Sequence, residues 1–198
     1  IANRADADLF ISLHCNYVGK HHVHGSETYV LGLHRAEDNL RVAKRENASI
    51  LLEEDYKSRY DGYDPNSPTS HIILSMYQNA YLDQSIRFAE QVERAFKESA
   101  DRHSRGVKQA GFLVLRETTM PSVLIESGFL SHSREEQFLL SDRGQQQMAE
   151  AIVLAFDRYK KKIESEEFLA DNQKHKPEDD TAYYVQLAVT SKKADTEA

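Results

Sequence analysis

The sequence has little of several features that would assign a class immediately. A single cysteine, Cys15, excludes an internal disulfide and leaves the redox compartment open. No apolar run approaches the length of about 18 residues that indicates a transmembrane helix. The 32 acidic residues outnumber the 25 Lys and Arg, and the net charge of −7 argues against a nucleic-acid partner bound by bulk electrostatics. Neither an initiator methionine nor a signal peptide is visible, so we expect an internal fragment with any localisation signal upstream.

The apolar segments fall into strand-like and helical patterns. Of the 198 residues, 40% are hydrophobic and 29% are charged, which is ordinary for a globular protein with one full core. Short runs of β-forming residues predict strands at 9–13, 27–31, 112–115 and 121–126. Helical spacing predicts helices at about 39–55, 85–102 and 136–162, and residues 1–7 are expected to be the end of a helix. The expected class is α/β, with a mixed sheet flanked by helices.

Two polar side chains stand where predicted strands end, His14 and Glu126. Ligands bind at the carboxyl ends of strands in open α/β sheets, and imidazole is a common zinc ligand. Burial at the end of an apolar strand would raise the pKa of Glu126 toward the range of a general base. The alternatives are a packed core histidine and a structural salt bridge, but the neighbouring residues favour function for both.

The loop after the first predicted strand contains His21, His22 and His24. Histidine-rich loops sometimes bind metal, but this spacing fits no zinc template, so a solvated loop is the favoured interpretation. His24 is also a candidate for lining a substrate groove. Cys15 and His14 are adjacent on a strand and therefore point to opposite faces, which favours a small buried thiol over a nucleophile.

Two longer segments suggest further organisation. Residues 39–84 form a connection too long for a simple loop, with a turn-rich break at 60–68 and a second helix expected from about residue 68. Residues 163–181 are dense in charge and are predicted to be a linker. The β-forming run at 183–189 then predicts a strand that opens another domain.

Four motifs, in this order, resemble those of the zinc-dependent N-acetylmuramoyl-L-alanine amidases of the amidase-3 type. They are ANRADADLFISLHCN at 2–16, GSETYVL at 25–31, RGVKQAGFLVLR at 105–116 and MPSVLIESGFLS at 120–131. The resemblance covers most of residues 1–162, which it implies are a catalytic domain lacking its N-terminal part.

This resemblance implies hydrolysis of the amide bond between N-acetylmuramic acid and L-alanine in peptidoglycan. It assigns His14 as a zinc ligand and Glu126 as the acid/base, with the other two protein ligands, a His and a Glu, expected upstream. Asn16 is expected to fix its loop or to line the substrate groove. The family also implies a periplasmic or cell-envelope location and a role in cell division.

Some members of that family carry an inserted helix that blocks the active site until an activator protein removes it. Residues 39–84 lie at the corresponding place, and Glu53 and Glu54 are the candidate autoinhibitory carboxylates. The favoured alternative is a helical hairpin that only shapes the groove. Residues 182–198 resemble the beginning of a SPOR domain, which binds peptidoglycan, after the linker at 163–181.

Two competing functions remain. A non-catalytic peptidoglycan-binding or regulatory protein would keep the groove and lose the metal. A zinc peptidase of another substrate class would use the same kinds of residue, although the order of the motifs favours the amidase.

Overall fold

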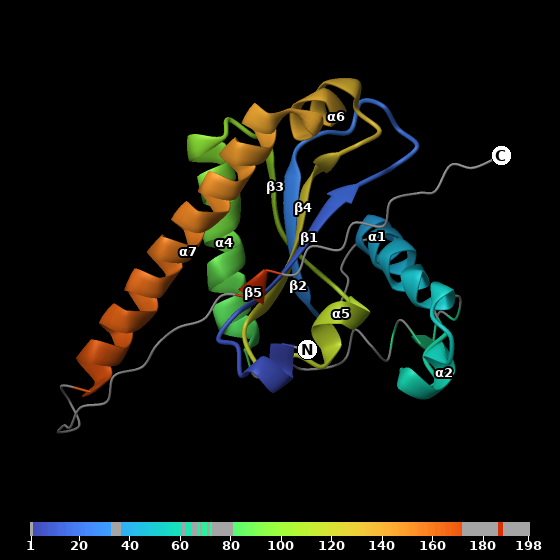
Figure 1. Ribbon diagram of the computed structural model, residues 1–198, viewed down its shortest axis with the longest axis horizontal. Coiled ribbons are helices and arrows are strands. Elements are labelled where there is room, and N and C mark those ends of the chain that lie inside the picture. The colour runs from blue at the N-terminus through green and yellow to red at the C-terminus, as the bar shows by residue number, and fades with distance from the viewer. Residues whose placement is uncertain are drawn as a thin grey trace.

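The computed structural model describes residues 2–32, 37–60, 62–64, 67, 69–70, 72, 81–171 and 186–187. Figure 1 shows a central sheet with α4 and α7 on one side and α1 and α2 on the other. The sheet contains β1 (Phe10–Asn16), β2 (Ser26–Leu31), β3 (Ser104–Ala110), β4 (Ser122–Phe129) and β5 (Gln186–Leu187). In the described part of the chain their order is β3-β2-β4-β1-β5.

The sheet is mixed, as the sequence predicted. Strand β1 runs parallel to β4 and β5, and β2 runs parallel to β3 but antiparallel to β4. Helices flank the sheet, and the predicted α/β class is confirmed. The described helices are η1 (Ala2–Ala5), α1 (Glu37–Asn47), η2 (Ala48–Leu52), α2 (Tyr56–Arg59), α4 (Leu82–Ser99), α5 (Leu113–Arg116), α6 (Ser133–Leu140) and α7 (Asp142–Asp171).

Strand β4 shows how the sheet is buried on both faces. Val123 and Ile125 pack into the cluster formed with α4 and α7, whereas Leu124 packs into a second cluster with Val42 and Ala43 of α1. Successive side chains of a strand point to opposite faces, so a strand covered on both sides is a continuous apolar run. This explains why residues 121–126 carry so little polar character. None of the helices in the described ranges is both long and apolar enough to cross a membrane.

The prediction of a strand at 112–115 is wrong. The strand in this part of the chain is β3, which ends at Ala110, and the apolar run after it forms the short helix α5. The side chain of Asn47 holds this turn, since its amide donates to the carbonyl of Gly111 and its oxygen accepts from the backbone N–H of Leu113. Periodicity cannot distinguish strand from helix in so short an apolar run.

Two predicted helix boundaries also differ. The helix expected at 136–162 is divided at Ser141 into α6 and α7, where the Ser141 hydroxyl donates to the carbonyl of Phe138 and accepts from the N–H of Gly144. Helix α7 then continues to Asp171, into the segment predicted to be a linker. Most of the second helix expected from residue 68 lies outside the described residues.

The predicted strand at 183–189 is described only at Gln186 and Leu187. These two residues pair with Phe10 and Ile11 at the edge of the main sheet. The assignment of 182–198 to a SPOR-like domain stays a prediction.

Candidate functional site

Three side chains form a row across the sheet. His14 of β1 is the register partner of Glu126 of β4, and Glu126 is also the partner of Glu27 of β2. Directly paired residues project to the same face of a sheet. That face is the one α1 covers, because Leu124, two residues before Glu126, packs against α1. The two residues that the sequence singled out therefore lie side by side, 112 positions apart in the chain.

The carboxyl group of Glu126 is buried and lacks hydrogen-bond partners among the described residues. Its exposed fraction is 0%, and neither carboxylate oxygen has a hydrogen-bond partner within the described ranges. Arg45 forms an ion pair with it, with Nη2 3.8 Å from Oε1. Burial, together with the charge of Glu46, raises the pKa of Glu126 to about 8, against the opposing effect of Arg45. A buried carboxyl group without hydrogen bonds is costly, and the single long ion pair with Arg45 is weak compensation, so a purely structural role is disfavoured.

The imidazole of His14 is not packed in the core, since 31% of the side chain is exposed. Its Nδ1 lies 2.8 Å from Oε2 of Glu46, and its Nε2 lies 2.9 Å from the hydroxyl of Ser12. Burial alone would raise the pKa of Glu46, but the hydrogen bonds with His14 and Arg45 outweigh it and the pKa is lowered. Glu46 is therefore an anion in contact with the imidazole.

Sequence reasoning missed Glu46. It considered Glu53 and Glu54 because they follow the apolar run 50–52, but the α-helix ends at Asn47 and a 3-10 turn follows. Glu53 still lines the same cavity of about 280 Å³ as His14 and Glu46, where it accepts a hydrogen bond from the Tyr60 hydroxyl at 2.9 Å. Glu54 is exposed. The signal available in the sequence was the position of Glu46 beside Ala43 and Asn47, both buried on α1.

The histidine loop lies elsewhere. The ring of His24 packs against those of His103 and His132, with centroids 5.2 and 5.3 Å away, and His24 does not line the cavity of His14. His21 contacts the carbonyl of Ser131 through Nδ1 at 2.8 Å, and His22 is exposed.

Asn16 is buried and holds two charged neighbours. Its amide donates to Glu27 at 3.1 Å, and its oxygen accepts from Arg45 at 3.0 Å. Asn16 therefore positions Arg45 beside Glu126. Cys15 was predicted to be buried, which is wrong: the strand end turns its thiol away from the face of His14, and it is exposed.

Zinc takes imidazole and carboxylate ligands, usually three protein groups in a catalytic site. His14 and Glu46 supply two such donors. In the ranges that the structure describes, no group of three or more His, Cys, Asp or Glu side chains is arranged to hold a metal ion. The described residues therefore offer part of a ligand set and not a complete one.

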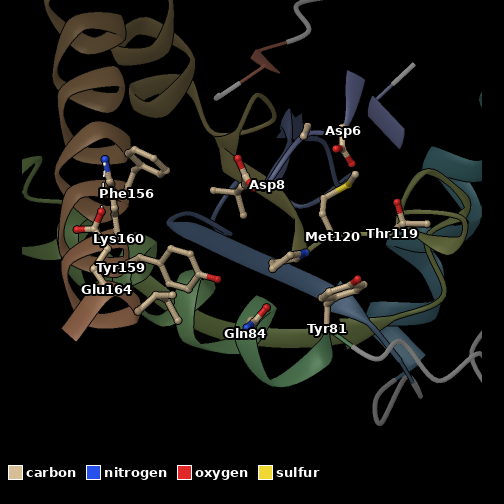
Figure 2. A pocket seen from close by; sticks show the side chains of 14 residues that line it. Asp6, Asp8, Tyr81, Gln84, Thr119, Met120, Phe156, Tyr159, Lys160 and Glu164 are labelled. Atoms are coloured by element: carbon tan, nitrogen blue, oxygen red, sulfur yellow. Dashed lines mark ion pairs between the residues drawn. The ribbon is translucent and has the colours of Figure 1, made fainter. Parts of the chain in front are cut away.

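A different cavity, of about 330 Å³, opens at the other end of the strands (Figure 2). Leu9 and Pro121, which line it, precede β1 and β4, whereas His14 and Glu126 lie toward the carboxyl ends of these strands. Figure 2 shows Tyr159 and Lys160 of α7 on one side of this cavity and Gln84 of α4 on another. The described lining includes no histidine, so the candidate site is the His14 end of the sheet.

An α/β sheet that pairs an imidazole with a buried carboxyl group of raised pKa, at the carboxyl ends of two parallel strands, has the elements of a hydrolase site. The chain belongs to the N-acetylmuramoyl-L-alanine amidase family, whose Amidase_3 sequence model matches residues 1–158. The resemblance seen in the four motifs is thereby confirmed.

Individual relatives agree with this assignment. The chain is 31% identical over 160 residues to the N-acetylmuramoyl-L-alanine amidase AmiC of Escherichia coli O6:H1. The matched region covers 80% of this chain and 37% of AmiC. The crystal structure of an N-acetylmuramoyl-L-alanine amidase from Clostridium difficile 630 matches with a TM-score of 0.53 and 26% identity, over 80% of this chain and 60% of that one. The structure of AmiC2 of Nostoc punctiforme matches with a TM-score of 0.53 and 25% identity, over 81% of this chain and 62% of AmiC2.

Proposed function

We propose that the protein hydrolyses the amide bond between N-acetylmuramic acid and L-alanine in peptidoglycan, as a zinc-dependent amidase of the cell envelope that acts in wall remodelling and daughter-cell separation. Family membership supports the reaction, although the chain spans only 37% of the AmiC relative. The observation that carries the proposal is Glu126, which is fully buried, has no hydrogen-bond partner within the described ranges and is paired in register with His14.

Glu126 is suited to move the proton. A pKa of about 8 lets the carboxylate accept a proton from the attacking water and then deliver it to the departing nitrogen of L-alanine near neutral pH. The water oxygen bonds to the carbonyl carbon of the lactyl group. The bond between that carbon and the nitrogen of L-alanine then breaks, and the amine leaves with the proton. His14 would hold zinc with protein ligands outside the described residues, and zinc when bound polarises the amide carbonyl and lowers the pKa of water.

Analysis of digested peptidoglycan tests this proposal. An amidase releases intact stem peptides from glycan, which mass spectrometry identifies, and one zinc per chain is expected. Glu126→Gln is expected to slow release by about 100-fold to 10,000-fold, the usual contribution of a general acid–base. Glu117→Gln, which alters an exposed carboxylate, is the matched control.

The competing functions give different results in the same assay. Cleaved stem fragments would identify a peptidase and contradict the amidase. A folded protein that binds peptidoglycan, holds no zinc and releases nothing would be a binding or regulatory protein.

We further propose that α1 closes the site and that Glu46, rather than Glu53 or Glu54, is the closing carboxylate. Its contact with His14 at 2.8 Å is the support. An activator protein that displaces α1 would then free the imidazole. Glu46→Gln is expected to raise peptidoglycan hydrolysis several-fold, whereas Glu53→Gln is expected to leave it unchanged. A lower rate in Glu46→Gln would contradict this role, and equal rates would favour a helix that only shapes the groove.

The proposed SPOR-like module at 182–198 would attach the enzyme to the glycan. Its support is the sequence resemblance at 183–191.

A further inference from the structure

Ser12 is a polar residue in an apolar part of β1. It projects to the same face of the sheet as Phe10 and His14, because side chains two positions apart on a strand point the same way. Its register partner on β4 is Leu124, and both Phe10 and Leu124 belong to the apolar cluster that packs against α1. A hydroxyl in apolar surroundings is costly unless it is hydrogen-bonded. Ser12 therefore needs a partner, and His14 supplies one.

Both nitrogens of the His14 ring have a partner. Nδ1 lies 2.8 Å from Oε2 of Glu46, and Nε2 lies 2.9 Å from Oγ of Ser12. All three side chains line the same cavity of about 280 Å³. A carboxylate can only accept a hydrogen bond, so Nδ1 carries the proton in this arrangement. In the neutral ring Nε2 is then an acceptor, and the Ser12 hydroxyl donates to it.

The hydroxyl of Ser12 is suited to both tautomers of this ring. A hydroxyl can donate or accept and rotates to suit its partner, whereas a carboxylate only accepts. Once α1 is displaced, Glu46 no longer holds the proton on Nδ1. The proton can then lie on Nε2 and be donated to the Ser12 oxygen, which leaves a lone pair on Nδ1 directed at the cavity. A histidine nitrogen needs such a lone pair in order to bind a metal ion, and the other nitrogen then needs an acceptor.

We propose that Ser12 is the positioning residue of His14: its hydroxyl holds Nε2 in both tautomers and keeps Nδ1 directed at the cavity while α1 closes and opens the site. The inference extends the closure proposed for α1, and it rests on the proposed function only for its effect on hydrolysis. A partner on the second nitrogen of a ligand histidine typically changes metal affinity or activity by about 10-fold to 100-fold. Ser12 is therefore expected to matter for the reaction without touching the substrate.

Nitrogen NMR of the full chain, labelled at histidine, tests the hydrogen bond itself. Spectra are recorded without metal at about pH 8.5, above the usual titration range of histidine, and the His14 signals are assigned by their absence in His14→Gln. Wild type is expected to carry the proton on Nδ1, with the Nε2 resonance moved toward that of a protonated nitrogen by the hydrogen bond from Ser12. Ser12→Ala is expected to lose this shift, and Ser12→Thr, which keeps the hydroxyl, to retain it. Ser165→Ala, which removes an exposed hydroxyl from α7, is the matched control.

The variant Glu46→Ala represents the open site in the same experiment. Its His14 ring is expected to carry the proton on Nε2, because the acceptor for Nδ1 is gone and the Ser12 oxygen remains. A proton that stays on Nδ1 in Glu46→Ala would overturn the exchange of tautomers. The same Nε2 resonance in wild type and Ser12→Ala would overturn the positioning role.

Hydrolysis gives the second measurement. Ser12→Ala is expected to release stem peptides about 10-fold more slowly than wild type, and Ser12→Thr to restore most of the rate. Wild-type hydrolysis in Ser12→Ala would also overturn the positioning role. The expected NMR shifts in a wild-type chain that releases no stem peptides would support the role of Ser12, and in that case only the proposed function fails.

Discussion

On the face of the sheet that α4 covers, the buried carboxylate of Glu93 accepts hydrogen bonds from Ser26 at 3.1 Å, from Thr28 at 2.7 Å and from Ser104. On the opposite face, the buried carboxyl group of Glu126 accepts none within the described ranges. Burial raises the pKa of both groups, but only for Glu93 do hydrogen bonds oppose the shift. A buried glutamate with a raised pKa therefore does not by itself mark a site. What distinguishes Glu126 is that its carboxyl group has no hydrogen-bond partner within the described ranges.

Glu135 resembles Glu93 in that hydrogen-bond partners stabilise its carboxylate. It accepts from the backbone N–H groups of Gly25 at 2.8 Å and Phe129 at 2.7 Å, and it pairs with Arg102. Gly25 approaches this carboxylate with φ +106°, and a Cβ there would lie 2.3 Å from the carbonyl oxygen of His103. Glu135 therefore ties together the segment before β2, the end of β4 and the segment between α4 and β3, which is a structural task.

The largest effect expected from the comparison is loss of stability in Glu93→Gln. The amide cannot accept all the hydrogen bonds of the carboxylate, so the free energy of unfolding is expected to fall by about 3 kcal/mol. Denaturant unfolding measures this change. Glu90→Gln, at an exposed position of the same helix, is expected to change it by less than about 0.5 kcal/mol. Equal stability of Glu93→Gln and wild type would remove the contrast between the two faces.

The pH dependence of stability is expected to report on Glu126. Its folded-state pKa is about 8, and that of a glutamate in an unfolded chain is about 4. Between these values the folded chain holds a proton that the unfolded chain has lost, so the free energy of unfolding falls as pH rises. The slope for one proton is at most about 1.4 kcal/mol per pH unit, and the contribution is fully present below pH 4 and is lost through pH 8.

Glu126→Gln has no proton to lose at this position. With metal removed by a chelator, the stability of this variant relative to wild type is therefore expected to increase between pH 5 and pH 8. A constant difference across that range would show that Glu126 ionises normally.

The smallest effect is expected at the opposite end of the strands. Lys160 lines the cavity of Figure 2 and is 3.7 Å from Glu164, an exposed pair one helical turn apart. Such pairs contribute about 0.5 kcal/mol or less. Lys160→Ala is expected to leave both stability and peptidoglycan hydrolysis close to wild type. A large loss of hydrolysis would place part of the site at the wrong end of the sheet.

The part of this site that could be predicted from the sequence depends on strand ends. His14 and Glu126 each close an apolar run, so the sequence pattern predicts that each lies at a strand end, where ligands bind in α/β sheets. That β1 and β4 are adjacent and parallel, which brings the two side chains together, is a property of the folded sheet. The contact of Glu46 with His14 could not be predicted in this way. It depends on where α1 ends and how the helix packs on the sheet, and helix ends are the least certain feature of a sequence-based assignment.

The same limit applies to Glu27. Its strand was predicted, but the pairing of β2 antiparallel to β4, which puts Glu27 beside Glu126, is a property of the whole sheet. The cavity of about 500 Å³ that Glu27 lines depends on the fold in the same way, because Arg45, Arg105 and Lys108 reach it from two distant segments.

The rate of stem-peptide release per folded molecule, measured in parallel for wild type, Glu126→Gln and Glu93→Gln, tests the central claim most directly. A decrease of at least about 100-fold is expected for Glu126→Gln, and a rate within about 2-fold of wild type for Glu93→Gln. A wild-type rate in folded Glu126→Gln would contradict the role of Glu126 in proton transfer.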